Sequence, residues 1–178
     1  AQALLARVYM QQGNYASALA AANDVLQNSG HSLASTFSGA FNNDSDSSED
    51  IFAFQVTSQD GSNVLISHYA DQPQGGRGGD IVIDTYLTLF DSTSDVRRGF
   101  TYTSGFNGGT LTGKYTNEYG NVPTIRVAEM HLIRVEANFR LGSSTGLAPL
   151  TEINALRGRS GAPALSSLSL DLIFNERQ

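Results

Sequence analysis

The stretch RVAEMHLIRVEANFRLG, residues 126–142, decides how the rest of the sequence is interpreted. Its apolar residues recur at helical spacing on two sides, which is the pattern of a helix buried between neighbours. One side carries Met130, Ile133, Ala137 and Leu141, and the other carries Ala128, Leu132, Val135 and Phe139. Residues 125–141 are therefore predicted to form one helix, which ends at Gly142.

A third strip of this helix is charged, with Arg126, Glu129, Glu136 and Arg140. Glu136 and Arg140 have the favourable order for a pair four residues apart. Carboxylates inside a helical layer need partners, because a buried unpaired charge is costly. A catalytic carboxylate dyad is one interpretation, and a charged link between helices is the favoured one. We expect Glu136 to pair with Arg157 or Arg159 of a following helix, residues 147–158.

The N-terminal residues predict another pair of helices, 1–13 and 15–28. The first has Leu4, Leu5, Val8, Tyr9 and Gln12 at three-to-four spacing. Gly13 supplies a helix stop and Asn14 an N-cap. Small and aromatic residues follow the tetratricopeptide pattern: Ala6, Tyr9, Gly13, Tyr15, Ala18, Ala22 and Val25.

The interval 29–124 differs in kind from these helical parts. Strands are predicted at 51–56, 99–103 and 111–116, and a short helix capped by Asp84 within 81–90. Segment 68–80 holds four glycines and a proline and is expected to be neither helix nor strand. The predicted fold is mainly α, with tetratricopeptide-like hairpins and a long loop-rich insert containing a few short strands. We expect residues 1–178 to be one domain fragment, with hairpins at 1–28 and 125–160, the insert at 29–124 and a further helix starting within 168–178.

Composition excludes several classes of function. The net charge is −6 and there is no basic run, which argues against nucleic acid as a partner. The chain has no cysteine, so it has no disulfide, thiolate zinc site or thiol nucleophile. No apolar run approaches the ~20 residues of a membrane span. The acidic run from Asp44 to Asp50 lacks the EF-hand spacing, and the three histidines share no metal spacing, so we expect no metal and no cofactor.

Longer motifs give a resemblance to a known family. IRVAEMHLIRVEANFRLG followed by EINALRGRSGAP resembles the signature of the SusD/RagB family. The matching positions are Arg126, Ala128, Glu129, Leu132, Ile133, Arg134, Glu136, Ala137, Gly142, Ile153, Asn154, Arg157, Arg159 and Gly161. Further segments resemble other parts of the family in the same order. They are the first helical pair, SEDIFAFQV, LFDSTSDVRRG with Asp95 and Arg97, GKY with Lys114 and Tyr115, and DLIFNERQ.

The resemblance implies a cell-surface protein of the outer membrane that is not an enzyme. Members of this family are anchored through a lipidated N-terminal cysteine, which this chain lacks, and cap a SusC-like TonB-dependent transporter. They help to capture oligosaccharides or peptides for import. We therefore expect this chain to be part of a longer protein that binds a glycan. The alternative is a tetratricopeptide-type scaffold that binds a protein or peptide in a concave groove.

Two loops supply candidate ligand residues, because sugars stack on aromatic rings while polar groups bind their hydroxyls. In the first loop, Tyr69 is the expected platform and Arg77 its main polar partner. Further polar residues of that loop are His68, Asp71, Gln72, Gln74 and Asp80. Tyr102, Phe106 and Asn107 form a second candidate. The alternatives are a mobile surface loop with Tyr69 tucked against the core, and a plain hairpin tip.

Overall fold

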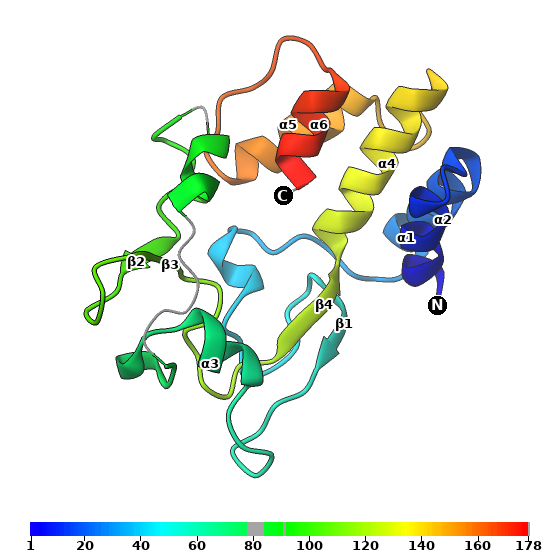
Figure 1. Ribbon diagram of the computed structural model, residues 1–178. Coiled ribbons are helices and arrows are strands. Elements are labelled where there is room, and N and C mark those ends of the chain that lie inside the picture. Colours follow the sequence, from blue (N-terminus) through cyan, green and yellow to red (C-terminus); the bar gives the residue numbers. More distant parts are fainter. Residues whose placement is uncertain (78–83, 91, 178) are drawn as a thin grey trace.

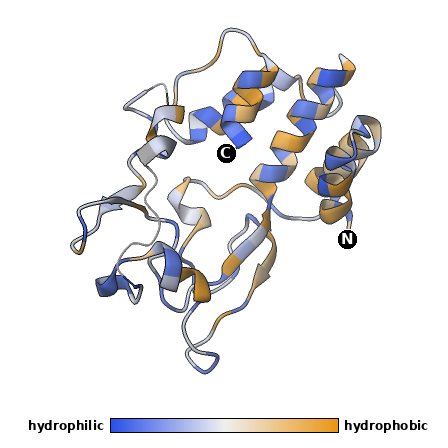
Figure 2. Cartoon of the chain, in the orientation of Figure 1, coloured by the Kyte–Doolittle hydropathy of each residue, from blue (hydrophilic) through white to orange (hydrophobic). Residues whose placement is uncertain are grey.

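The computed structural model describes residues 1–77, 84–90 and 92–177. Figure 1 shows a helical half, which contains α1, α2, α4, α5 and α6, and a loop-rich half with short strands and α3. Figure 2 shows hydrophobic residues along the helices and in β1 and β4, whereas the long connections are mostly hydrophilic or intermediate. Over the described ranges, no helix has both the length and the apolar character needed to cross a membrane.

Helix α4 (Val127–Leu141) is the centre of the helical half. It packs against α1 (Gln2–Gln11) and α2 (Tyr15–Asn28) on one side and against α5 (Pro149–Arg159) and α6 (Leu170–Arg177) on the other. Met130 and Ile133 are buried towards α1 and α2, and Val135 is buried with Ile153 and Ile173. The predictions of a helix buried on two sides and of a mainly α fold with helical hairpins are confirmed.

Helix α2 begins as predicted, but α1 buries a different face from the one that its apolar spacing indicated. The Asn14 side chain caps α2 by accepting a hydrogen bond from the Ser17 N–H at 3.2 Å. The buried residues of α1 are Ala3, Ala6 and Met10. The apolar residues Leu4, Leu5 and Val8 are exposed instead. Small alanines allow close helix contact, so the larger side chains of α1 face outwards.

The predicted start of the long helix was wrong by two residues, and the strand before it was missed. Residues Val122–Arg126 form β4, which pairs antiparallel with β1 (Asp50–Phe54). Arg126 therefore lies opposite Asp50 in a strand and is not on the charged strip of the helix. The β-branched residues of VPTIR suit a strand, but the partner lies about 75 residues earlier, beyond the reach of a local pattern.

The remaining elements of the insert are short. Strands β2 (Thr101–Thr103) and β3 (Thr110–Thr112) pair antiparallel, and η1 (Ser38–Ala40), η2 (Gln72–Gln74) and η3 (Asp84–Leu89) are 3-10 helices. Helix α3 (Val64–Tyr69) extends into segment 68–80, so the prediction that this segment holds no helix was wrong. The predicted cap by the Asp84 side chain lies outside what the structure describes.

The ion pairs of Glu136 differ from the prediction. Its buried carboxylate accepts from Arg140 Nε at 2.8 Å and also pairs with Arg177 of α6. Arg157 pairs with Glu176, and Arg159 pairs with Glu49. The charged link between helices is present, but the expected partner was wrong because α6, rather than α5, brings its arginine to this point of α4.

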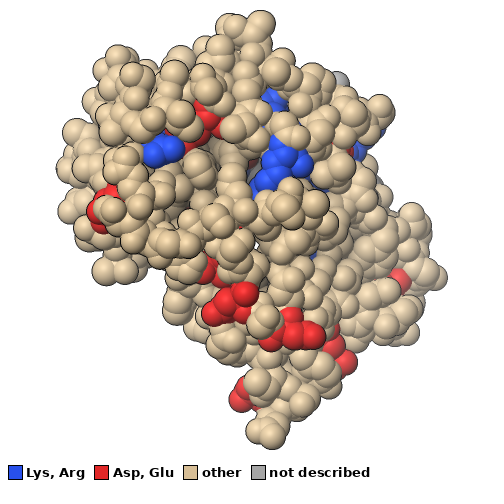
Figure 3. All heavy atoms as spheres, turned by 180° about the vertical axis from the view of Figure 1, so that it is seen from behind, with Lys and Arg blue, Asp and Glu red and all other residues tan. Residues whose placement is uncertain are grey.

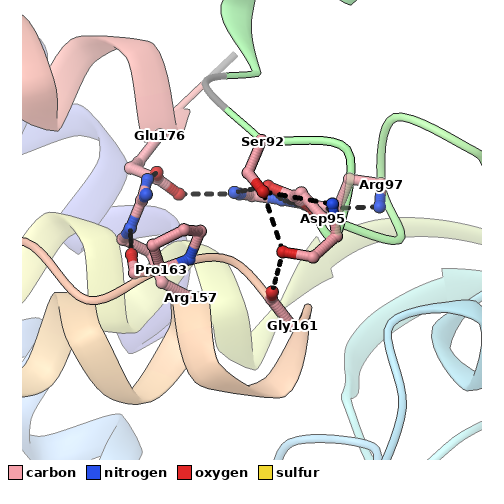
Figure 4. A network of polar contacts seen from close by, with 8 residues as sticks. Ser92, Asp95, Arg97, Arg157, Gly161, Pro163 and Glu176 are labelled. Atoms are coloured by element: carbon pink, nitrogen blue, oxygen red, sulfur yellow. Dashed lines mark hydrogen bonds and ion pairs between the residues drawn. The ribbon is translucent and has the colours of Figure 1, made fainter.

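A second network joins the insert to the C-terminal helices (Figure 4). Arg97 binds both carboxylate oxygens of Asp95, with Nε–Oδ1 and Nη2–Oδ2 distances of 2.9 and 2.6 Å. Its Nη1 lies 2.6 Å from Glu176 Oε2, and Glu176 also pairs with Arg157. Burial alone would lower the pKa of Arg97, but the hydrogen bonds to Asp95 and Glu176 outweigh it and raise the pKa. This guanidinium therefore stays charged and links both halves.

Candidate functional site

The first candidate loop is held in place by small buried residues. The Asn63 side chain caps α3 by accepting from the Leu65 N–H at 2.9 Å, and Ile66 and Ala70 are fully buried beneath it. The loop then turns back so closely that a Cβ atom on Gly76 would lie 1.9 Å from the Ala70 carbonyl oxygen. Only glycine fits this approach, so Gly76 is required for the path of the loop.

Asp71 joins the two candidate loops. Its Oδ2 accepts from the Gly105 N–H at 2.6 Å and its Oδ1 accepts from the Gln72 N–H at 2.9 Å. The Asp71 N–H in turn donates to the Tyr102 hydroxyl at 2.8 Å. Burial alone would raise the pKa of Asp71, but hydrogen bonds from the Gln72 backbone, the Ser104 side chain and the backbone of residues 105–106 outweigh it and lower the pKa. Its carboxylate is thus a fixed link between the loops.

The hairpin tip presents one aromatic ring to solvent. Phe106 is 70% exposed. The turn that carries it is closed by hydrogen bonds from the Phe106 N–H to Ser104 Oγ at 3.1 Å and from the Gly108 N–H to the Ser104 carbonyl at 3.0 Å. Because Gly105 is bound to Asp71, this exposed ring is held beside the first loop.

The other predicted residues of the first loop fall into two groups. His68 and Arg77 are exposed, whereas Tyr69 and Gln74 are partly buried. The Tyr69 ring lies against Tyr115, with ring centroids 5.1 Å apart. Within the part of the chain described, the buried Oε1 of Gln74 accepts no hydrogen bond. The expected contribution of Asp80 lies outside the described residues.

Some residues of the site were not among those predicted. Ser104 and Gly105 hold the tip, and Tyr115 covers part of Tyr69. Tyr115 belongs to the GKY segment, and nothing local in the sequence links it to Tyr69, which lies 46 positions earlier. Among the described residues, no three His, Asp or Glu side chains are arranged to hold a metal ion.

The arrangement combines a fixed exposed ring with polar groups on a neighbouring loop. Aromatic rings bind the C–H faces of sugars, and charged or imidazole side chains bind hydroxyl groups. Phe106 offers such a ring, and His68 and Arg77 are exposed on the loop that Asp71 ties to it. A polar ligand that also has apolar faces suits this surface.

Comparison with known proteins identifies the family. Residues 91–178 match the SusD family, while no curated protein matches the sequence. The fold is similar to that of surface glycan-binding protein A from Bacteroides uniformis, with a TM-score of 0.75 at 18% identity over 99% of this chain and 45% of that one. A SusD superfamily protein from Bacteroides thetaiotaomicron gives a TM-score of 0.75 at 24% identity, over 99% and 45% of the two chains.

A third structure, solved with a xylogluco-oligosaccharide, gives a TM-score of 0.73 at 23% identity, over 99% of this chain and 46% of that one. The chain thus spans less than half the length of these structures. Identities this low establish the fold alone. Residues 91–178 thus belong to the SusD family, and the chain as a whole shares the fold of a SusD superfamily structure.

Proposed function

We propose that the protein binds oligosaccharides at the cell surface and has no enzymatic activity. Family membership supports this proposal, as do the neighbours described as a glycan-binding protein and as a complex with a xylogluco-oligosaccharide. The observation in this chain that carries the proposal is the Asp71–Gly105 hydrogen bond, which ties the exposed Phe106 ring to the loop of His68 and Arg77.

The proposed ligand face has Phe106 as its outer platform and Tyr69 as an inner one. Tyr69 is supported from behind by Tyr115, so only part of its ring is available to a ligand. Arg77 and His68 supply hydrogen bonds to hydroxyl groups, and Asp71 acts through the loops that it positions. Tyr102 supports the first loop through its hydroxyl, which accepts a hydrogen bond from the Asp71 N–H.

Binding of a glycan panel by the full-length protein tests this site. Loss of one stacking ring costs about 1–3 kcal/mol by analogy with ring–base stacking, which is roughly a 5- to 150-fold loss of affinity. We expect Phe106→Ala and Tyr69→Ala to show such losses in calorimetry or affinity electrophoresis. Phe54→Ala is the matched control, because Phe54 is an exposed phenylalanine on β1, outside both loops. Equal binding by all variants would place the site elsewhere.

We further propose that the protein is anchored by a lipid at the outer membrane and delivers its ligand to a SusC-like TonB-dependent transporter. We expect the helical hairpins to face this partner, and the exposed apolar residues Leu4, Leu5 and Val8 of α1 support this orientation. Cross-linking from residues 14–30 should then recover the transporter. Recovery only from residues 68–80 would reverse the assignment.

The same apolar face of α1 keeps a second candidate function open, namely a scaffold that binds proteins or peptides. Binding of peptides by the full-length protein, with no response to any glycan in the panel, would favour that function. The Phe106→Ala variant separates the two, because the hairpin tip lies in the other half of the molecule from α1 (Figure 1).

A further inference from the structure

A cavity of about 380 Å³ lies between the insert and helices α4, α5 and α6. Aromatic and basic side chains dominate its wall, including Phe41, Tyr86, Lys114, Tyr115, Arg126 and Arg159. Its size falls within the range of small-ligand pockets. The cavity is distinct from the proposed glycan face, although the two share the contact between Tyr115 and Tyr69.

Lys114 is the only lysine in the 178-residue sequence. Its ammonium nitrogen lies 5.5 Å from the ring centroids of both Phe41 and Tyr86. No carboxylate of the described residues lies within ion-pair distance of it. The arginines around the cavity differ in this respect, since Arg97, Arg126, Arg159 and Arg177 each bind a carboxylate.

The charges around this lysine do not balance. Glu49 is shared by Arg126 and Arg159, so one carboxylate serves two guanidiniums. Arg159 Nε is also buried without a hydrogen-bond partner in the described part of the chain. The acidic groups on the wall, Glu129 and Glu176, are already engaged by arginines. Among the side chains that the structure describes, the cavity therefore has excess positive charge.

The electrostatic cost is visible on Lys114 itself. Burial, together with the positive charges of Arg126 and Arg97, lowers its pKa to about 8. On the wider surface, basic and acidic side chains also gather in different regions. On the face opposite to that of Figure 1, basic side chains lie in the upper, helical half and most acidic ones lie in the lower half (Figure 3).

We propose that this cavity binds a carboxylate group, held by the Lys114 ammonium and by the guanidiniums of Arg126 and Arg159. A single negative charge matches the Lys114 ammonium, which has no counter-ion among the described residues, and the rings of Phe41 and Tyr86 can cover the apolar part of the group. The carboxylate can come from an acidic sugar or from an Asp or Glu side chain elsewhere in the full-length protein. This inference goes beyond the proposed function, because a neutral glycan can bind at Phe106 whether or not the cavity binds a carboxylate.

The test follows Lys114 in the full-length protein by NMR after ¹³C-dimethylation of its lysines. The Lys114→Met variant assigns the signal, and Arg98→Met is the matched control because Arg98 is exposed. Glucuronate is titrated against glucose as the neutral counterpart. If an acidic sugar is the ligand, glucuronate should raise the pKa of Lys114 by at least about one unit, and Lys114→Met should weaken glucuronate binding at least about tenfold. Arg98→Met should leave it unchanged.

An Asp or Glu side chain of the full-length protein as the source of the carboxylate gives a different result. A Lys114 pKa already near or above the ordinary value of 10.5 before any sugar is added, with no response to glucuronate, would assign the carboxylate to the protein's own chain. A pKa that stays near 8 in the free protein and with glucuronate would overturn the proposal. In either case, binding of neutral oligosaccharides, with its dependence on Phe106, reports separately on the proposed function.

Discussion

Replacement of Glu49 tests how the insert is held against the helical half. The Glu49 side chain is fully buried, and its oxygens accept from Arg126 Nη1 at 3.0 Å and from Arg159 Nη1 at 2.6 Å. The Ala34 N–H donates to the same carboxylate at 3.2 Å. The variant Glu49→Gln keeps nearly the same volume but removes the charge that balances both guanidiniums.

The expected cost follows from these contacts. Removing one partner of a buried ion pair costs about 3–5 kcal/mol, because the remaining charge stays buried without compensation. The side chains of Arg126 and Arg159 are 24% and 11% exposed, so water can solvate them in part. We therefore expect a loss near the lower end, about 3 kcal/mol in the free energy of unfolding.

Urea denaturation of the full-length protein, followed by circular dichroism, measures this loss. Asp171→Asn is the control, because Asp171 is exposed on α6 and its replacement should change stability by about 0.5 kcal/mol or less. A double-mutant cycle with Arg159→Met should give a coupling energy of about 1–3 kcal/mol. A loss below about 1 kcal/mol, or strictly additive effects, would refute the view of Glu49 as a buried link.

Three further perturbations test other parts of the structure. Glu136→Ala should cost about 1–3 kcal/mol, less than a fully buried pair, because its partner Arg177 is 25% exposed; unchanged melting would contradict this. Gly76→Ala should cost about 1–3 kcal/mol by overpacking, whereas Gly158→Ala, with open space around it in α5, should stabilise by up to about 1 kcal/mol. With no carboxylate bound, unfolded Lys114 keeps its proton up to its ordinary pKa of 10.5 while the folded protein releases it near pH 8. The free energy of unfolding should then rise between these pH values by up to about 1.4 kcal/mol per pH unit, and Lys114→Met should abolish the rise. A flat profile in the unmodified protein would show that folding does not lower the pKa of Lys114.

Local patterns in the sequence determined the helical framework. The two apolar sides of the long helix predicted its burial between neighbours, and Asn14 predicted the start of α2. These features depend on residues three or four apart, so a single segment contains the information. The order of short motifs also led to the family, because each motif could be recognised without knowing its partner.

The division of the chain into an insert and two hairpins within one domain stays a prediction, as do the ligand roles of Tyr69 and Arg77. For the candidate site, the sequence supplied the two loops and their exposed residues, Phe106 among them. It did not supply the contact between Asp71 and Gly105, which lie 34 positions apart, or the cover that Tyr115 gives to Tyr69.

Tertiary structure alone decided the partners of the charged residues and the strand before α4. Arg126 entered a strand because β1 offers it a hydrogen-bonded edge, and Glu136 met Arg177 because α6 crosses α4 at that point. Glu49 and Lys114 look like ordinary surface charges in the sequence, yet the first is buried between two arginines and the second stands beside a cavity with no counter-ion among the described residues. The identity of a charge is local, but its desolvation and its partner depend on which distant segments pack around it.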